Sequence, residues 1–191
     1  MKGCRSLTKD EAGAVTAAFR GRYAVRDRAL FLLGLYSGLR ISELTSVRLG
    51  DVFQHGKIVD RLAVRRSCTK GKREGRVILL HPNAKAALRQ WLSIGIFASP
   101  ESPVFYGSKS DSSPITRQQA WRILRRTFSR AGLTGPLGTH SLRKSFASRA
   151  WDLLDHDLVK LQKLLGHKQV TSTVSYISFR DDQLDEVVLA M

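Results

Sequence analysis

The chain has 191 residues, which is enough for one domain or for one domain with a small appendage. Its 32 Lys and Arg against 16 Asp and Glu give a net charge of +16 and a pI near 10.6, so we expect a polyanionic partner, nucleic acid before an anionic membrane surface. The hydrophobic fraction of 42% argues against a disordered chain, and the sequence contains neither an apolar run of 18 residues nor an apolar segment behind the N-terminal charges, which argues against a membrane span and a secretory signal.

The predicted secondary structure is mostly helical. Residues 8–11 (TKDE) form a capping box, which places a helix start at Thr8, and residues 37–38 (SG) are typical of a helix end. Apolar spacing and end signals of this kind predict helices over residues 8–20, 25–36, 41–47, 83–94, 116–132, 141–153, 158–165, 172–178 and 182–190. With no internal repeat and no clear linker, residues 1–191 are expected to form a single domain.

A β-hairpin with a charged tip is predicted between the third and fourth of these helices. Residues 57–65 and 76–80 are rich in β-formers and flank the basic, glycine-containing residues 67–75, and a further short strand is expected at 104–106. The hairpin and the arginine-rich helix 117–130 would suit a duplex held between them, although the helix fits an ordinary solvated face equally well. The side chains expected to contact DNA are Arg65, Arg66, Lys72, Arg73, Arg122, Arg125, Arg126 and Lys144.

Four short motifs stand in order along the chain. They are residues 38–44 (GLRISEL), 139–143 (THSLR), 164–167 (LLGH) and 173–176 (TVSY). Their ionisable residues are Arg40, Glu43, His140, Arg143, His167 and Tyr176. Each has an ordinary structural explanation alone: an arginine paired with a glutamate, a histidine at a helix end, or a tyrosine in a core. Those explanations do not account for the order and spacing of all four motifs together.

These residue types suit cleavage of a phosphodiester without a metal ion. Two guanidiniums can neutralise the charge that builds on the non-bridging oxygens in the transition state, and Arg40 and Arg143 are the candidates. His140 and His167 can donate hydrogen bonds to the same phosphate or transfer protons near neutral pH. A tyrosine hydroxyl becomes a good nucleophile when neighbouring cations stabilise its phenolate.

The motifs and the basic hairpin resemble the signature of the tyrosine recombinases, the phage-lambda integrase family, over nearly the whole chain. The resemblance implies an α+β fold that is mainly α, a helical bundle with a small, three-stranded antiparallel β-sheet on one edge. It also implies a site-specific recombinase that forms a 3′-phosphotyrosine through Tyr176 and releases a 5′-hydroxyl, without metal, cofactor or ATP. A hairpin lysine would protonate the leaving oxygen, with Lys70 favoured over Lys72, and Glu43 would orient Arg40 or a neighbouring backbone amide.

The resemblance further implies double-stranded DNA as the partner and a tetramer on two DNA sites, formed by a chain that is monomeric when free. The segment 177–191 is expected to pack on a neighbouring protomer or on its own, and accessory DNA-bending proteins stay open as partners. Family members usually carry an N-terminal helical domain that closes around DNA, so the chain is expected to be either a fragment or a naturally short member. The two cysteines, Cys4 and Cys68, lie far apart in the sequence, which suits a reducing cytoplasm. We therefore expect a cytoplasmic enzyme that acts in a bacterial nucleoid or is encoded by a phage or mobile element.

Three other functions stay open at this point. A type IB topoisomerase would use the same chemistry to relax supercoils, and a non-catalytic DNA-binding module would need only the basic surface. A ribosomal-type RNA binder would explain the charge but not the spacing of Tyr176. The sequence does not distinguish integration, excision and inversion, and His55, His81 and His156, which lie outside the motifs, are expected at the surface.

Overall fold

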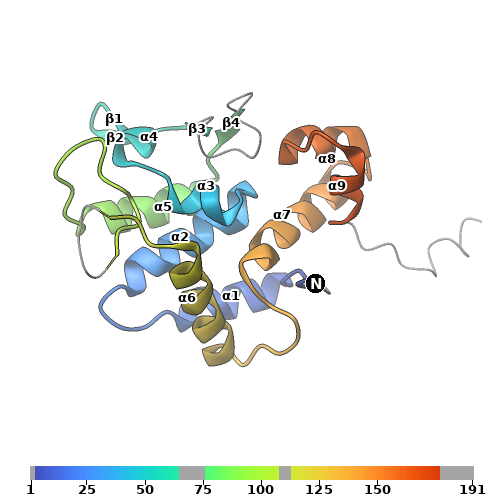
Figure 1. Cartoon of the computed structure of the whole chain (residues 1–191), viewed down its shortest axis with the longest axis horizontal. Coiled ribbons are helices and arrows are strands. Elements are labelled where there is room, and N and C mark those ends of the chain that lie inside the picture. The colour runs from blue at the N-terminus through green and yellow to red at the C-terminus, as the bar shows by residue number, and fades with distance from the viewer. Residues whose placement is uncertain (1–2, 65–75, 108–112, 177–191) are drawn as a thin grey trace, which may run out of the picture. The chain divides into compact units, whose positions relative to one another are not determined.

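The computed structural model describes residues 3–64, 76–107 and 113–176, and the chain divides into two compact units, residues 1–146 and 147–191 (Figure 1). The helices of the first unit are α1 (Lys9–Ala18), α2 (Ala24–Ser37), α3 (Ile41–Thr45), α4 (Leu49–Val52), α5 (Pro82–Leu92) and α6 (Arg117–Arg130). Helix α7 (Thr139–Leu153) begins in the first unit and ends in the second, which also holds α8 (Leu158–Leu165) and α9 (Val170–Val174). Within the described ranges, no helix combines the length and apolar character that crossing a bilayer requires.

Helix α2 is the central helix of the first unit. Leu30 and Leu33 belong to an apolar cluster shared with α5 and the strands, whereas Phe31 and Leu35 belong to a second cluster shared with α1 and α6. A helix that is apolar around most of its circumference is buried on several sides. The end of α2 at Gly38, where the first motif begins, is therefore held by packing from two directions.

The described strands form two small antiparallel sheets rather than the predicted single sheet of three strands. Strands β1 (Phe53–Gln54) and β2 (Lys57–Ile58) form a tight hairpin, and β3 (Arg61–Val64) pairs with β4 (Arg76–Leu79) in a register that joins Arg61 to Leu79. The hairpin turn, His55-Gly56, has positive φ at both positions, as such two-residue turns require. The predicted strand 57–65 is thus divided, because its first two residues pair backward with β1; the strands still lie along one edge of the helices of this unit (Figure 1).

Most predicted helices are confirmed within two residues at each end. The short helix α4 was not predicted, and residues 104–106 make no strand but lie next to isolated bridges at Pro103 and Tyr106. Helix α9 spans Val170–Val174, so it begins two residues before the predicted helix 172–178 and ends four residues before the predicted end. The hairpin tip and the predicted helix 182–190 lie outside the described residues.

Candidate active site

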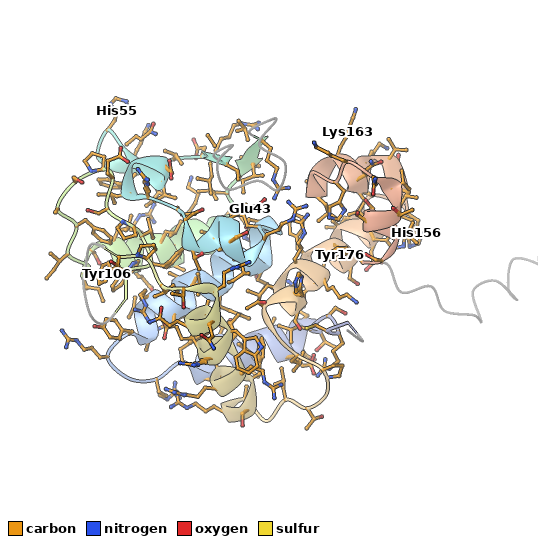
Figure 2. All side chains as sticks on the ribbon, viewed as in Figure 1. Glu43, His55, Tyr106, His156, Lys163 and Tyr176 are labelled. Carbon is orange, nitrogen blue, oxygen red and sulfur yellow. The ribbon has the colours of Figure 1, made fainter. Side chains whose placement is uncertain are left out.

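The first motif places Arg40 and Glu43 at the start of α3, where Figure 2 labels Glu43. The Glu43 side chain is buried, and it accepts hydrogen bonds from the backbone N–H of Arg40 (2.8 Å), from Arg40 Nη1 (3.0 Å) and from Arg76 Nη2 (3.2 Å). A buried carboxylate is stable only with partners of this kind. Glu43 thus holds Arg40 while 31% of the Arg40 side chain stays exposed and accessible to a ligand.

Arg76 reaches Glu43 from the first position of β4. Burial lowers the pKa of Arg76, and the Glu43 carboxylate opposes that shift while Arg40 adds to it. Two guanidiniums therefore share one carboxylate, which leaves a net positive charge at the start of α3.

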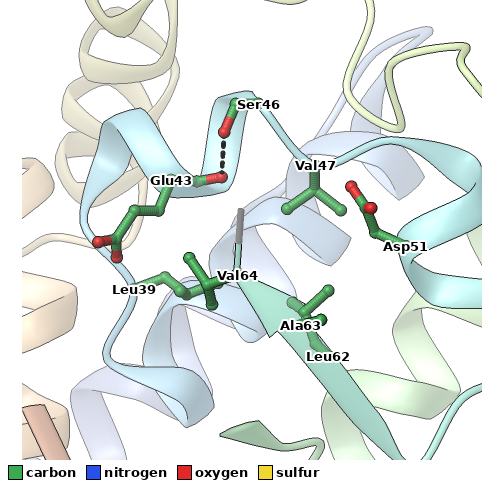
Figure 3. Close-up of a pocket in the computed structure, with 8 residues that line it drawn as sticks. All are labelled: Leu39, Glu43, Ser46, Val47, Asp51, Leu62, Ala63 and Val64. Atoms are coloured by element: carbon green, nitrogen blue, oxygen red, sulfur yellow. Dashed lines mark hydrogen bonds between the residues drawn. The ribbon is translucent and has the colours of Figure 1, made fainter. Parts of the chain in front are cut away.

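A small cavity lies behind Glu43 (Figure 3). Its apolar lining consists of Leu39, Val47, Leu62, Ala63 and Val64. Its volume of about 10 Å³ is close to the minimum for one water molecule. Ser46 Oγ donates to the Glu43 carbonyl over 2.8 Å and fixes the end of the turn. The space on this side of Glu43 is therefore nearly filled and mostly apolar, with Ser46 and Asp51 as the other polar residues of its lining.

Arg143 lies on α7 and is 1% exposed. Its Nη1 donates to the carbonyl of Gly38, 105 positions earlier in the chain. Gly38 caps α2 with φ +61°, and a Cβ there would lie 2.4 Å from Cδ1 of Phe146. Glycine is thus required at this position both by the left-handed backbone and by the close approach of α7.

His140 lies in the first turn of α7, three residues before Arg143. Its pKa is lowered, first by partial burial of the ring and then by the positive charges of Arg143, Lys144 and Arg40. The shift favours the neutral imidazole at pH 7, a form that can accept a proton.

The second unit carries His167 and Tyr176. Helix α8 ends at Gly166, and the side chain of Gln162 donates to the carbonyl of His167 over 3.1 Å, while the N–H of His167 donates to the Gln162 carbonyl over 3.1 Å. Tyr176 follows α9 (Figure 2), and its ring centroid lies 5.3 Å from that of His167, with 40° between the two ring planes. Thr173, which is fully buried, places Oγ1 3.0 Å from Nδ1 of His167. The last two motifs thus meet within one unit.

The family of the chain follows from comparison with known proteins. The model of the phage integrase family matches residues 5–183. The chain belongs to the phage integrase family. Among similar family members, the tyrosine recombinase XerD of Corynebacterium glutamicum is 33% identical over 168 residues, which cover 85% of this chain and 51% of that protein. The probable integrase/recombinase YoeC of Bacillus subtilis is 32% identical over 157 residues, covering 82% of this chain and 80% of the relative.

Solved structures of integrase-family proteins have the same fold. The XerA recombinase matches with a TM-score of 0.78 at 22% identity, over 99% of this chain and 64% of that one. A lambda integrase tetramer bound to a Holliday junction matches with a TM-score of 0.69 at 20% identity, over 93% of this chain and 49% of that one. The predicted tyrosine-recombinase catalytic-domain fold is therefore confirmed, and the chain spans about half the length of the XerD relative.

Within this phage integrase fold, the predicted site residues fall into two groups. Arg40, Glu43, His140 and Arg143 lie in the first unit, and His167 and Tyr176 lie in the second. The hairpin residues Arg65, Arg66, Lys70, Lys72 and Arg73, and the segment 177–191, lie outside the described residues.

The arginines of helix α6 that were predicted to contact DNA lie on two different sides of the helix. Arg125 Nη1 donates to the Leu137 carbonyl over 3.3 Å, and its guanidinium lies 5.9 Å from the ring centroid of Trp121. Arg122 and Arg126 instead line a hollow of about 190 Å³ beside Tyr23. These arginines are thus not one continuous row.

Two residues of the site, Arg76 and Thr173, were not predicted from the sequence. Arg76 is the first residue of a predicted strand, and nothing local marks its pairing with Glu43, 33 positions earlier. Thr173 stands among several Ser and Thr residues at 171–175. The signal that could have found Thr173 is its spacing of six residues from His167 across a helix end.

Proposed function

We propose that this chain is the catalytic domain, residues 1–191, of a site-specific recombinase that cleaves and rejoins duplex DNA through Tyr176. The oxygen of Tyr176 attacks phosphorus, a P–O(Tyr) bond forms and the P–O5′ bond breaks. The products are a 3′-phosphotyrosine and a free 5′-hydroxyl. A 5′-hydroxyl reverses the step on the same or another strand, so resealing needs no ATP. Family membership and relatives named as tyrosine recombinases support this reaction over supercoil relaxation by a type IB topoisomerase and over binding alone.

Arg40 and Arg143 act on the non-bridging oxygens of the scissile phosphate. Each guanidinium is fixed by an uncharged or anionic group of the first unit, the Gly38 carbonyl for Arg143 and Glu43 for Arg40. Donors fixed before the reaction cost no reorganisation when charge develops on the phosphate. No metal or cofactor is part of this proposal.

Protons move at two atoms in the proposed step. His140, whose lowered pKa favours the neutral ring, takes the phenolic proton of Tyr176. Lys70 supplies a proton to O5′, with Lys72 as its alternative. If this assignment is correct, Lys70→Ala should be rescued by a 5′-bridging phosphorothiolate, whose sulfur leaves without a proton, and Lys72→Ala should not. The reverse pattern would move the role to Lys72.

We assign DNA binding to the basic residues around this site. Lys144 and Arg125 lie close to the start of α7, and we assign them, with Arg122, Arg126 and the hairpin residues Arg65, Arg66, Lys72 and Arg73, to the phosphate backbone. We also propose assembly as a tetramer in which segment 177–191 contacts a neighbouring protomer, in the cytoplasm of a bacterial host. A lambda integrase tetramer on a Holliday junction is a structural neighbour that supports this assembly.

The observation that carries the proposal is the contact of the Tyr176 and His167 rings within one unit, 5.3 Å apart. The test is trapping of covalent complexes on randomly nicked genomic DNA, quenched with detergent and separated on a denaturing gel. Tyr176→Phe should abolish the adduct and leave DNA retention unchanged. Tyr23→Phe, which removes a hydroxyl outside the site, is the matched control and should form the adduct normally. An undiminished adduct from Tyr176→Phe would end the assignment.

A further inference from the structure

The contact between His167 and Thr173 differs from the other threonine contacts in the described helices. Thr16, Thr45 and Thr127 each donate their hydroxyl to a backbone carbonyl four residues earlier in the same helix, which is the usual choice of a helical threonine. Thr173 also lies in a helix, but its Oγ1 is 3.0 Å from the ring nitrogen Nδ1 of His167. Thr173 therefore contributes to the position of a site residue instead of to its own helix.

The direction of this hydrogen bond follows from burial. The Thr173 hydroxyl is fully buried, and a buried donor without an acceptor costs about 1–3 kcal/mol. In the part of the chain that the structure describes, Nδ1 of His167 is the acceptor in reach of this hydroxyl. The hydroxyl proton therefore points at Nδ1, which must carry a lone pair. A neutral imidazole with a lone pair on Nδ1 carries its proton on Nε2.

The backbone of His167 is fixed as well. Its N–H and its carbonyl are both bonded to Gln162, and the residue as a whole is 9% exposed. With the backbone and Nδ1 held, the remaining polar atom of the ring is Nε2, at its opposite edge. The tautomer then decides what that edge does, because Nε2–H donates a hydrogen bond and a bare Nε2 would accept a proton.

We propose that Thr173 is a positioning residue that holds neutral His167 in its Nε2–H form, so that His167 donates a hydrogen bond and does not act as the base toward Tyr176. The assignment of the tautomer rests on the geometry alone. Its consequence for cleavage rests on the proposed function. The division of roles that follows gives the proton of Tyr176 to His140 and leaves His167 as a donor to the phosphate.

The first test is nitrogen NMR of the full chain labelled with ¹⁵N-histidine, with His167→Gln used to assign the His167 signals. In the wild type at pH 7.5, His167 should give a pyridine-type Nδ1 and a pyrrole-type Nε2. Thr173→Ser keeps the hydroxyl and should keep this pattern. Thr173→Val, which has nearly the same shape, should give a mixture of tautomers. A pyrrole-type Nδ1 in the wild type, or a Ser variant that behaves like Val, would overturn the proposal.

The second test is the rate of adduct formation at saturating protein. Thr173→Val should cleave about 3- to 10-fold more slowly, the loss expected from one hydrogen bond, with unchanged DNA affinity. Thr173→Ser should cleave at the wild-type rate. Thr171→Val makes the same chemical change on the exposed side of α9 and should have no effect. Equal rates in the Thr173→Val and Thr171→Val variants would contradict the proposal, whereas loss of the adduct in Tyr176→Phe tests the proposed function separately.

Discussion

The charged residues of the first unit and the His167–Tyr176 pair of the second are held in place by different means. In the first unit the contacts involve charged side chains and join distant parts of the chain: the ion pair of Glu43 and Arg76 spans 33 positions, and the hydrogen bond from Arg143 to the Gly38 carbonyl spans 105. In the second unit they are mostly uncharged and local, since Gln162 and Thr173 lie five and six positions from His167. The positions of the arginines proposed to contact the phosphate thus depend on the core of the first unit, whereas the position of the proposed nucleophile, Tyr176, depends on contacts near the ends of α8 and α9.

The largest effect is expected from the arginines of the first unit. Arg40→Ala or Arg143→Ala should slow adduct formation about 10²–10³-fold, because each removes a charged donor to the transition state. Lysine should rescue poorly, since a point charge does not reproduce the planar guanidinium. Arg48→Ala, which removes an exposed ion pair with Glu101, is the control. Rates within threefold of wild type for both site variants would remove these arginines from the reaction.

The next effect is on stability and concerns Glu43. Glu43→Gln leaves Arg40 and Arg76 beside each other without a compensating carboxylate, and should lower the free energy of unfolding by about 3 kcal/mol. Glu101→Gln breaks the exposed pair with Arg48 and should cost about 1 kcal/mol or less. Urea unfolding at pH 7.5 measures both. Equal losses would mean that Glu43 is no more important than a surface carboxylate.

The sequence predicted the local features of both units better than their long-range contacts. The capping box at Thr8, the Gly38 helix end and helix α8 follow from residues within one or two turns, and all are confirmed. The division of the predicted strand 57–65 was missed because pairing with β1 is decided by the turn at His55-Gly56. The role of Arg76 was missed for a different reason: a tertiary contact across 33 positions, and not local propensity, brings it to Glu43.

An effect of similar size is expected at Gly38. Gly38→Ala adds a left-handed alanine and a Cβ 2.4 Å from Phe146, so we expect a loss of about 2–4 kcal/mol, combining backbone strain with overpacking. Gly56→Ala, also at positive φ but with open space around its Cβ, should cost only the strain, about 1–2 kcal/mol. Thermal unfolding compares the two. If the two variants melt alike, the close approach of α7 to Gly38 does not contribute.

The smallest effect concerns pH and His140. Because its folded-state pKa lies below the ordinary value of about 6.5, the unfolded chain binds more protons as the pH falls through that value. The stability contribution of neutral His140 is therefore present above about pH 6.5 and decreases as the pH is lowered toward the folded-state pKa. Urea midpoints at several pH values should fall less steeply in His140→Gln than in wild type. A pH profile of His140→Gln identical to wild type would contradict the shift.

The most direct test of the account is to identify the residue that becomes joined to DNA. The wild-type protein is incubated with randomly nicked genomic DNA in EDTA and without ATP, the covalent complex is digested with nuclease and protease, and the remaining nucleotide-bearing peptide is sequenced by mass spectrometry. The account predicts a phosphodiester on Tyr176, with the DNA joined through its 3′ end. A nucleotide on any other side chain, a 5′ linkage, or an adduct that forms only with added Mg²⁺ would contradict it.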